Sequence, residues 1–560
     1  MTPTFSDYQV TPPDFESTRA TYEDLTRQLH KASDAGTCIG IVNEWDTLLG
    51  GIKEWASLTE VRFQQNTRDE TIIKAKDHLH ETLPRFLDLE TSFKKELLES
   101  PHRDSLTEHF GPQLFALWEC DARSFSPAIK EDMVAESKRA SDYTSLVASA
   151  EFEFRGKTLT FSGLAKYQDD SDRACRKEAH EVASRWCSEH QASFDSIYDD
   201  LVKLRHRMAT TLGYPDFVAM AYQRMRRIGY EAEDVVRFRQ EVSEHVVPLA
   251  CEIAGKQQEL LGVDRFMYWD TPVHHPDGNP APRGDHDWMI DQATTMFRKM
   301  GHGLDTLFED MKERCLIDLK ARPGKAEGGF CDFFNQFGYP FIFANFNGTR
   351  GDVDVFAHEM GHAYQSYQSR EQAHSDLVWP TTEACEIHSM GLEFLTWPHM
   401  DLFYGDEADR LRRIHLAWSL QFIPYGVTVD HFQHLVYAEP DASPKGRNRM
   451  WQTLERQYLP WWDFGPLAYE GSGRLWQMKQ HLFNCPFYYI DYTLALTCAL
   501  QFWQKSRTDR DATMESYARL CRRGGRVPFH ELTESAGLKS PFERGCLAEV
   551  VADARAFLLG

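Results

Sequence analysis

The chain has 560 residues, of which 42% are hydrophobic, and this is enough for more than one packed lobe of an ordinary globular protein. Its 85 acidic and 62 basic residues give a formal net charge of −23, which argues against a nucleic-acid-binding protein because such a protein needs a basic face. The 12 cysteines are scattered without a CxxC pair, and neither a secretory signal nor a run of 18 apolar residues is visible, so we expect reduced thiols, a cytoplasmic location and no membrane span.

The first part of the chain is expected to be helical. From Phe15 to about Ala209 it is rich in Glu, Lys, Leu and Ala and contains few helix breakers. Within this part, residues 151–161 alternate between apolar and polar around a central Arg155-Gly156, and this pattern predicts a β-hairpin. We predict an N-terminal helical lobe over residues 1–200 and a second region over 201–560, although chain crossings could make the lobes discontinuous.

A loop rich in proline and glycine is predicted from Trp269 to Trp288. It contains His274, His275 and His286. A group of histidines can bind a metal ion, but a segment of this composition is more often a solvated loop, and we assign no metal to it.

A second hairpin is predicted before residue 350. The runs 328–334 and 340–346 are rich in aromatic and β-branched residues and are joined by Asn335–Tyr339. Their phenylalanines are expected to lie in the core. An exposed edge strand near Gly328–Phe334 or Phe341–Phe346 could also pair with an extended peptide and bind it regardless of its sequence.

The apolar, helical run from Val353 to Tyr367 contains the most informative motif, H-E-x-x-H, at residues 358–362. We expect Asp352 to cap this helix. Positions i and i+4 of a helix are one turn apart, so the imidazoles of His358 and His362 can reach one metal ion. Glu359 can then act as the base for a water on that metal.

A catalytic zinc site has three protein ligands and one open position, so a third ligand is needed. A second helix is predicted after Pro380. It carries Glu383, Glu386 and Glu393 on roughly one face, a carboxylate stripe that is costly to bury without a cation. Periodicity does not choose among these three residues, and His388 is also a possible ligand.

The C-terminal part offers hydrogen-bond donors that could stabilise an oxyanion. Pro486 can open a helix that runs to about Gln504, with Tyr488 and Tyr492 on one face, and His481 precedes it. A helix rich in tyrosine more often packs in a core, and the sequence alone leaves both interpretations open.

These segments together resemble the thimet oligopeptidase/oligoendopeptidase F family of zinc metallopeptidases, and most of all the bacterial oligoendopeptidase F-like enzymes, including Pz peptidases. The family pairs H-E-x-G-H with a downstream E-x-x-S-x-x-x-E, which matches residues 386–393 here. The segments 346–354 and 486–492 match as well. The resemblance covers residues 328–505, and the first 300 residues carry no motif that can be matched.

The resemblance implies roles for individual residues. Glu386 becomes the third zinc ligand beside His358 and His362, with one zinc ion per chain and Glu359 as the catalytic base. Glu393 becomes a residue that orients a ligand histidine.

From the C-terminal part, the resemblance implies that Tyr492, together with His481, supports the oxyanion, and that Tyr488 serves as a second tyrosine. The residues between Phe487 and Asp491 depart from the Gly-rich version of thimet-type members, so the mobility of that loop is not carried over.

The fold expected is mainly α and zincin-like, with two helical lobes around a deep channel and a small β-sheet beside the H-E-x-x-H helix. The function expected is a zinc endopeptidase that acts on short peptides, with 201–560 as the catalytic region. A metallocarboxypeptidase is one alternative, and it would need a cationic group placed for the substrate carboxylate. A catalytically silent peptide-binding protein is another, but it would lack a ligand or the base, and all of them are present.

Overall fold

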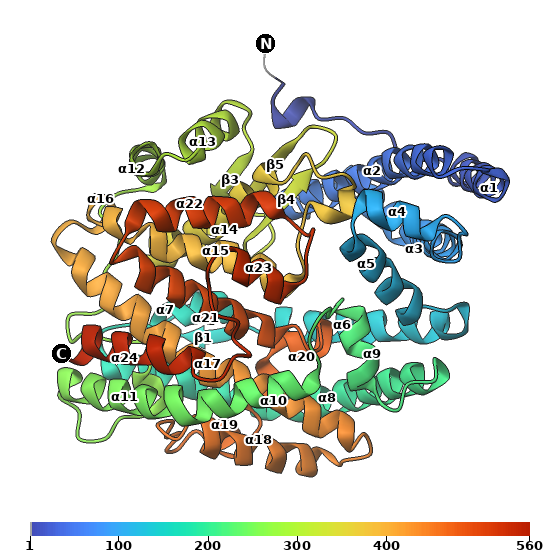
Figure 1. Cartoon of the computed structure of the whole chain (residues 1–560). Coiled ribbons are helices and arrows are strands. Elements are labelled where there is room, and N and C mark those ends of the chain that lie inside the picture. The colour runs from blue at the N-terminus through green and yellow to red at the C-terminus, as the bar shows by residue number, and fades with distance from the viewer. Residues whose placement is uncertain (1–2) are drawn as a thin grey trace. The chain divides into compact units, whose positions relative to one another are not determined.

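The computed structural model describes residues 3–560, which divide into two compact units (Figure 1). Unit 1 comprises Met1–Arg123, Ala281–Asp406 and Cys498–Ser540, and unit 2 comprises Ser124–Pro280, Glu407–Thr497 and Pro541–Gly560. Both units are therefore discontinuous in sequence. The boundary predicted near residue 200 lies inside one long helix, Arg173–Thr211. It coincides with none of the positions at which the chain passes from one unit to the other.

Unit 1 is mostly helical. Its helices are α1 (Phe15–Lys31), α2 (Ala35–Gln65), α3 (Glu70–Leu98), α4 (Arg103–Phe110), α5 (Pro112–Ser124), α12 (His286–Met300), α13 (Leu304–Glu313), α14 (Arg350–Gln368), α15 (Thr382–Leu395), α16 (Asp401–Tyr404), α22 (Arg510–Arg523) and α23 (Phe529–Ser535). Its strands are β3 (Ile317–Lys320), β4 (Phe330–Phe334) and β5 (Tyr339–Phe346).

Unit 2 is also mostly helical, which confirms the mainly-α fold class. Its helices are α6 (Lys130–Ala148), α7 (Phe161–Gln168), α8 (Arg173–Thr211), α9 (Phe217–Arg224), α10 (Ala232–Glu241), α11 (Val247–Leu261), α17 (Ala408–Ala438), α18 (Pro444–Tyr458), α19 (Ala468–Gly471), α20 (Gln480–Asn484) and α24 (Cys546–Leu559). Helix α21 (Tyr489–Ser506) contains the boundary between the units. The deep channel expected between the lobes stays a prediction.

The first predicted hairpin is present in unit 2. Strands β1 (Phe152–Phe154) and β2 (Lys157–Leu159) pair antiparallel. Arg155 and Gly156 have φ angles of 50° and 77°, and two left-handed residues in succession make the tight turn whose twist matches a hairpin.

The second predicted hairpin forms part of a three-stranded sheet in unit 1. Strands β4 and β5 pair antiparallel, and β3 pairs parallel to β5, so the strand order is β3-β5-β4. Strand β4 is therefore an edge strand, as the sequence predicts for Gly328–Phe334. The alternative, Phe341–Phe346, is excluded, because β5 lies in the centre of the sheet with both of its sides paired.

Helix α14 carries the H-E-x-x-H residues and packs against β4, β5 and α15, so the sheet lies beside this helix as predicted. The helix begins after Thr349 and not after Asp352. Asp352 lies in the first turn, where its carboxylate accepts hydrogen bonds from the backbone N–H groups of Asn347 and Gly348. The expected capping role of Asp352 is thus corrected: its side chain reaches back to fix the loop before the helix.

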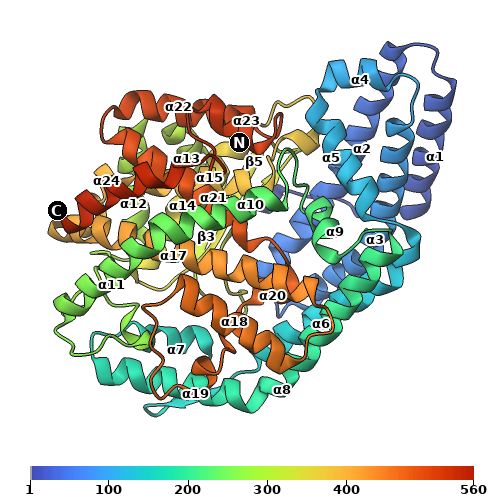
Figure 2. The same cartoon turned by 60° about the horizontal axis from the view of Figure 1, so that its bottom comes forward.

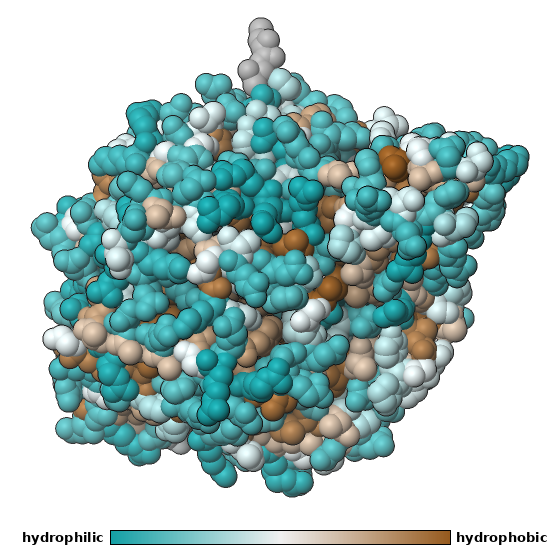
Figure 3. All heavy atoms as spheres, viewed as in Figure 1, coloured by the Kyte–Doolittle hydropathy of each residue, from teal (hydrophilic) through white to brown (hydrophobic). Residues whose placement is uncertain are grey.

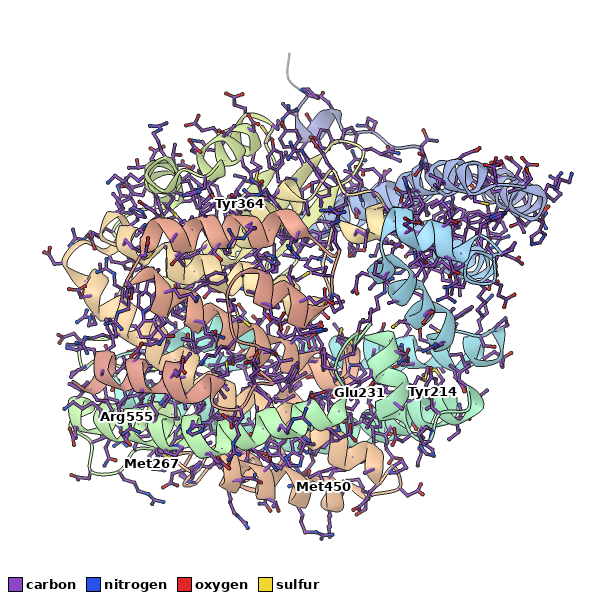
Figure 4. All side chains as sticks on the ribbon, viewed as in Figure 1. Tyr214, Glu231, Met267, Tyr364, Met450 and Arg555 are labelled. Carbon is purple, nitrogen blue, oxygen red and sulfur yellow. The ribbon has the colours of Figure 1, made fainter. Side chains whose placement is uncertain are left out.

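The far end of α14 is anchored by Tyr364, which is labelled in Figure 4. Its hydroxyl donates to the backbone carbonyl of His302 at 2.7 Å, and its ring stacks on Tyr517 of α22. The face drawn in Figure 3 is mostly hydrophilic.

Candidate functional site

The structure brings His358, His362 and Glu386 together in unit 1. The two histidines lie one turn apart on α14, and Glu386 lies on α15, which packs against α14. Glu386 Oε2 is 3.2 Å from His358 Nε2 and 3.6 Å from His362 Nε2. The sequence alone left Glu383, Glu386, Glu393 and His388 open, and of these Glu386 places an oxygen between the two imidazoles.

This arrangement fits a tetrahedral metal ion. Ligand atoms at about 2.0–2.2 Å from zinc and at tetrahedral angles are separated by about 3.4 Å. The two distances from Glu386 Oε2 lie on either side of this value. Two imidazole nitrogens and one carboxylate oxygen are also a ligand set that catalytic zinc sites use. These three side chains would hold the metal.

Two further side chains orient the candidate ligands. Glu393 Oε1 lies 2.7 Å from His358 Nδ1, so it can accept the ring proton there and leave the lone pair of Nε2 directed toward Glu386. Ser389 donates its hydroxyl to Glu386 Oε2 at 2.9 Å. Glu393 and Ser389 are the second glutamate and the serine of the E-x-x-S-x-x-x-E pattern, and each contacts a candidate ligand.

The site is electrostatically suited to a cation. Burial opposes a charge on His358, but its hydrogen bonds to Glu386 and Glu393 outweigh burial and raise its pKa well above the usual value. Burial also opposes a charge on Glu386, but its contacts with His358 and His362 lower its pKa well below the usual value. The negative charge that holds a proton on His358 would likewise favour a bound metal ion.

Glu359 is placed differently from the candidate ligands. Its side chain is buried, and burial raises its pKa while the neighbouring histidines lower it. A Cβ on Gly329, just before β4, would lie 3.6 Å from Glu359 Oε1. The edge strand therefore starts directly beside this carboxylate, in keeping with the small sheet that was expected beside the H-E-x-x-H helix.

The remaining polar residues of this region have other partners. Glu383 is fully buried and accepts a hydrogen bond from the Thr381 hydroxyl at 3.0 Å. His388 is also fully buried, and burial lowers its pKa to about 3. Asp354 pairs with Arg350 at 3.7 Å. None of these three residues belongs to the group of described residues whose ligand atoms lie close enough together to hold a metal ion, which consists of His358, His362 and Glu386.

His481, Tyr488 and Tyr492 form a second cluster, which belongs to unit 2. The ring of Tyr492 lies 4.9 Å from that of Tyr488 and 5.9 Å from that of His481, measured between centroids. All three side chains are partly exposed, so they can contact a ligand. Tyr489, a buried neighbour, also joins the cluster, with its ring 5.5 Å from Tyr492.

Helix α21 begins at Tyr489, three residues after the proline expected to open it, because the backbone before it is held in another conformation. Phe487 has a φ of 68°, which is unusual for a residue other than glycine. Its N–H donates to Gln433 Oε1 at 2.6 Å, and its carbonyl accepts from Arg227 Nη2 at 2.7 Å. Arg227 also pairs with buried Asp491, between the two tyrosines.

Sequence analysis missed Arg227 and Gln433. Arg227 lies 264 residues before Asp491, and Gln433 lies 54 residues before Phe487, so no local pattern connects them. One residue in the sequence indicated that such a partner exists. Asp491 is an acidic residue between aromatic residues in an apolar helix, and a buried carboxylate requires a partner.

The histidine-rich loop is not part of a candidate metal site. Among residues 3–560, a second group of side chains could hold a metal ion, in addition to the group on α14 and α15. It consists of Glu241, Glu244 and His245. His274, His275 and His286 are in neither group. No helix in this described part of the chain is long and apolar enough to cross a membrane.

The chain is similar to known peptidases in sequence and in structure. A model of the peptidase M3 N-terminal domain matches residues 5–125, and a model of peptidase family M3 matches residues 166–278 and 304–551. The solved structure of Pz peptidase A with an inhibitor is 40% identical, with a TM-score of 0.95 and 99% of each chain covered.

Two curated relatives are more distant. An oligoendopeptidase F homolog of Mycoplasma pneumoniae is 25% identical over 44% of this chain, and oligopeptidase PepF of Bacillus subtilis is 19% identical over 70% of it. The matches span 40% and 58% of the lengths of these two relatives.

Proposed function

Because the chain belongs to peptidase family M3, we propose that it is a zinc-dependent oligoendopeptidase, which hydrolyses internal bonds of short, unstructured peptides. The observation that carries this proposal is the position of Glu386 Oε2 within 3.2 and 3.6 Å of the two imidazole nitrogens, with Glu359 on the same helix. A cytoplasmic location is part of the proposal and is supported by the scattered cysteines.

His358, His362 and Glu386 would hold one zinc ion. When bound there, zinc would polarise the scissile carbonyl and increase the acidity of the attacking water. Glu393 keeps the proton of His358 on Nδ1, and Ser389 keeps the Glu386 carboxylate in place, so two of the three ligands are oriented before a metal ion arrives.

Glu359 would be the general base. Its carboxylate takes the proton of the attacking water and later passes it to the nitrogen of the leaving amine, which must be protonated to depart. The buried position of Glu359 supports this role, because few waters compete for its carboxylate.

Tyr492 and His481 would stabilise the negative charge that develops on the carbonyl oxygen, with Tyr488 as a second phenol donor. Their partial exposure and mutual contacts support a shared ligand-binding role.

The edge strand β4 would bind the substrate backbone. It begins beside Glu359, so an extended peptide paired with it would present its backbone to that carboxylate. Such pairing needs free N–H and C=O groups, which an unstructured peptide has and a folded protein lacks. It does not need a free terminus, which favours an endopeptidase over a carboxypeptidase.

The test is a digestion of three substrates followed by mass spectrometry: a nonapeptide with both termini blocked, the same peptide with free termini, and a folded globular protein. We expect internal cleavage of both peptides, with at most a modest slowing by the blocking groups, and negligible loss of the folded protein. Complete protection of the blocked peptide would overturn the endopeptidase and favour a carboxypeptidase. No cleavage of any substrate by the zinc-loaded protein would favour a peptide-binding protein.

A further inference from the structure

Unit 2 contains a cavity of about 470 Å³. None of the residues that line this cavity is among those discussed above as catalytic. Helices α11, α17 and α24 pack against one another (Figure 2). Residues of these three helices and of the His274-His275 loop line the cavity. Its volume lies in the range of small-molecule binding sites. Its apolar lining residues are Ile253, Leu260, Ile414, Ala417, Leu558 and Leu559.

The charged residues of the lining are mostly basic. Lys256, Arg410 and Arg413 contribute three cations, and Asp409 contributes one carboxylate. The Asp409 side chain is 89% exposed and pairs with Arg412, which is not part of the lining. Lys256 and Arg410 each pair with a glutamate outside the lining, so the positive charge left for a ligand is mainly that of Arg413, and in a chain with a net charge of −23 this favours an anionic ligand.

Arg413 is the cation most available to a ligand. One of its terminal nitrogens donates to the backbone carbonyl of Leu558 at 3.2 Å, and its guanidinium lies 5.3 Å from the centre of the Phe557 ring. Among the described residues, no carboxylate lies within ion-pair distance of Arg413. Its remaining N–H groups can therefore bind an anion without breaking an existing ion pair.

Arg410 and His275 supply a second, oriented pair of groups. Arg410 pairs with Glu407, and its Nη1 lies 3.2 Å from His275 Nδ1. The backbone N–H of Asp277 also points at that nitrogen, at 3.2 Å. Because two N–H groups point at Nδ1, this nitrogen is the hydrogen-bond acceptor of the imidazole ring. Nε2 then carries the ring proton and is a further hydrogen-bond donor.

The fold itself holds the cavity open. The side-chain amide of Gln257 on α11 donates to the carbonyls of Thr271 at 3.0 Å and Val273 at 2.8 Å, which ties the histidine loop to the helix. Arg555 on α24, labelled in Figure 4, pairs with Glu252 on α11. A ligand would therefore meet preformed walls, and little binding energy would be lost in ordering them.

From this cavity we infer that the protein binds a monocarboxylate with a single apolar tail, such as a medium-chain fatty acid. The tail fills the space between the aliphatic side chains, and the carboxylate binds the Arg413 guanidinium at the mouth. A planar carboxylate matches the two parallel N–H groups of a guanidinium. Each methylene group added to the tail, until the cavity is full, should tighten binding by about fourfold.

Isothermal titration calorimetry on the full chain tests this inference, with decanoate, hexanoate and decanamide as probes. We expect decanoate to bind to one site, hexanoate to bind more weakly and decanamide to bind at least about tenfold more weakly, because it lacks the charge. Competition by N-acetyl-leucyl-leucine would show that the C-terminus of an apolar peptide is accepted too, and absence of competition would assign the site to fatty acids.

Three variants locate the site. Arg413→Gln removes the anion-binding group, and Ala417→Trp fills the cavity, so each should weaken decanoate binding by about tenfold or more. Arg237→Gln on α10 changes the charge equally, but Arg237 pairs with Asp234 at the surface and lies outside the lining, so this variant should leave the affinity within about twofold. Thermal melts check the folding of each variant. Equal affinity of decanoate for wild type and Arg413→Gln, or equal binding of decanamide, would overturn the inference.

Discussion

Gly361 of α14 faces the backbone of His388 on α15 so closely that a side chain has no room between them. A Cβ built on Gly361 would lie 2.5 Å from the carbonyl oxygen of His388 and 2.6 Å from the Cα of Ser389. Both are backbone atoms of a helix and cannot turn aside. The glycine in H-E-x-G-H therefore sets the spacing between the helix with the two histidines and the helix with Glu386.

We predict that Gly361→Ala lowers the free energy of unfolding by about 1–3 kcal/mol, because the added methyl group forces the two helices apart. The variant should also lose most of its bound zinc, since Glu386 moves away from the histidines. Gly40→Ala on α2 is the control. No atom lies within 4 Å of that added Cβ, so the change should stabilise the helix by about 0.5–1 kcal/mol. Urea unfolding and zinc analysis measure both, and normal zinc content in Gly361→Ala would contradict this account.

Metal content should depend on Glu386 and not on Glu383. Purified wild type is expected to contain about one equivalent of zinc per chain, and Glu386→Gln much less, because one of three ligands loses its charge. Glu383→Gln should retain the metal, since its carboxylate binds Thr381. Elemental analysis gives the answer directly. The opposite result for the two variants would mean that the wrong carboxylate has been chosen.

Loss of the base should abolish turnover without loss of metal. We expect Glu359→Gln to keep its zinc and to lower kcat by roughly 10²- to 10⁴-fold, because the amide cannot accept the proton of the attacking water. Kinetics on a fluorogenic peptide and zinc analysis of the same preparation measure both effects. Normal turnover with zinc bound would rule out Glu359 as the base.

The hydroxyl of Tyr492 should act on the transition state. Tyr492→Phe is expected to reduce kcat by roughly 10²-fold with little change in KM. Tyr489→Phe is the matched control, since the Tyr489 side chain is buried and its hydroxyl accepts a hydrogen bond from Lys479 at 3.2 Å. If Tyr492→Phe alters only KM, the residue binds substrate or packs in the cluster.

Stability should fall as pH rises through the titration of Glu54. Burial raises the pKa of this carboxyl on α2 to about 7, although the backbone N–H of Gln336 donates to it at 3.1 Å. The folded state therefore holds a proton that the unfolded state releases near pH 4.5, and up to about 3 kcal/mol of stability is lost between about pH 5 and pH 8.

Glu54→Gln keeps the acceptor and removes the titration. In urea unfolding of the metal-free protein, we expect the variant to match wild type at pH 5 and to be more stable at pH 8. The same difference between the two proteins at both pH values would show that Glu54 does not titrate in this range.

Local spacing was enough to predict part of the site. The histidines at i and i+4 and the glutamate between them follow from one helix, and the edge strand β4 follows from one hairpin. Local spacing did not identify the candidate third ligand, because Glu383, Glu386 and Glu393 share a helical face and only the packing of α15 on α14 separates them. The resemblance to a family was needed to choose Glu386.

The sequence could not reveal contacts made over long distances along the chain. Arg227 fixes the backbone before Tyr488 from 260 residues away, and its importance depends on burial beside Asp491. The choice between β4 and β5 as the edge strand stayed open for the same reason. Its parallel partner, β3, precedes the hairpin, and a parallel pairing leaves no turn that a sequence pattern could show.

The interleaving of the two units constrains how the protein is made. Helix α14 packs against α22, so the helix with the two histidines emerges from the ribosome well before a helix that supports it. At roughly 5–20 residues per second, the roughly 140 residues between Gln368 and Arg510 take about 10–30 s to synthesise. During this time the nascent chain exposes apolar surface that unit 1 later buries. Neither unit can finish folding before its last segment is translated. Aggregation should therefore begin when synthesis is slow in this stretch or when the chain terminates early.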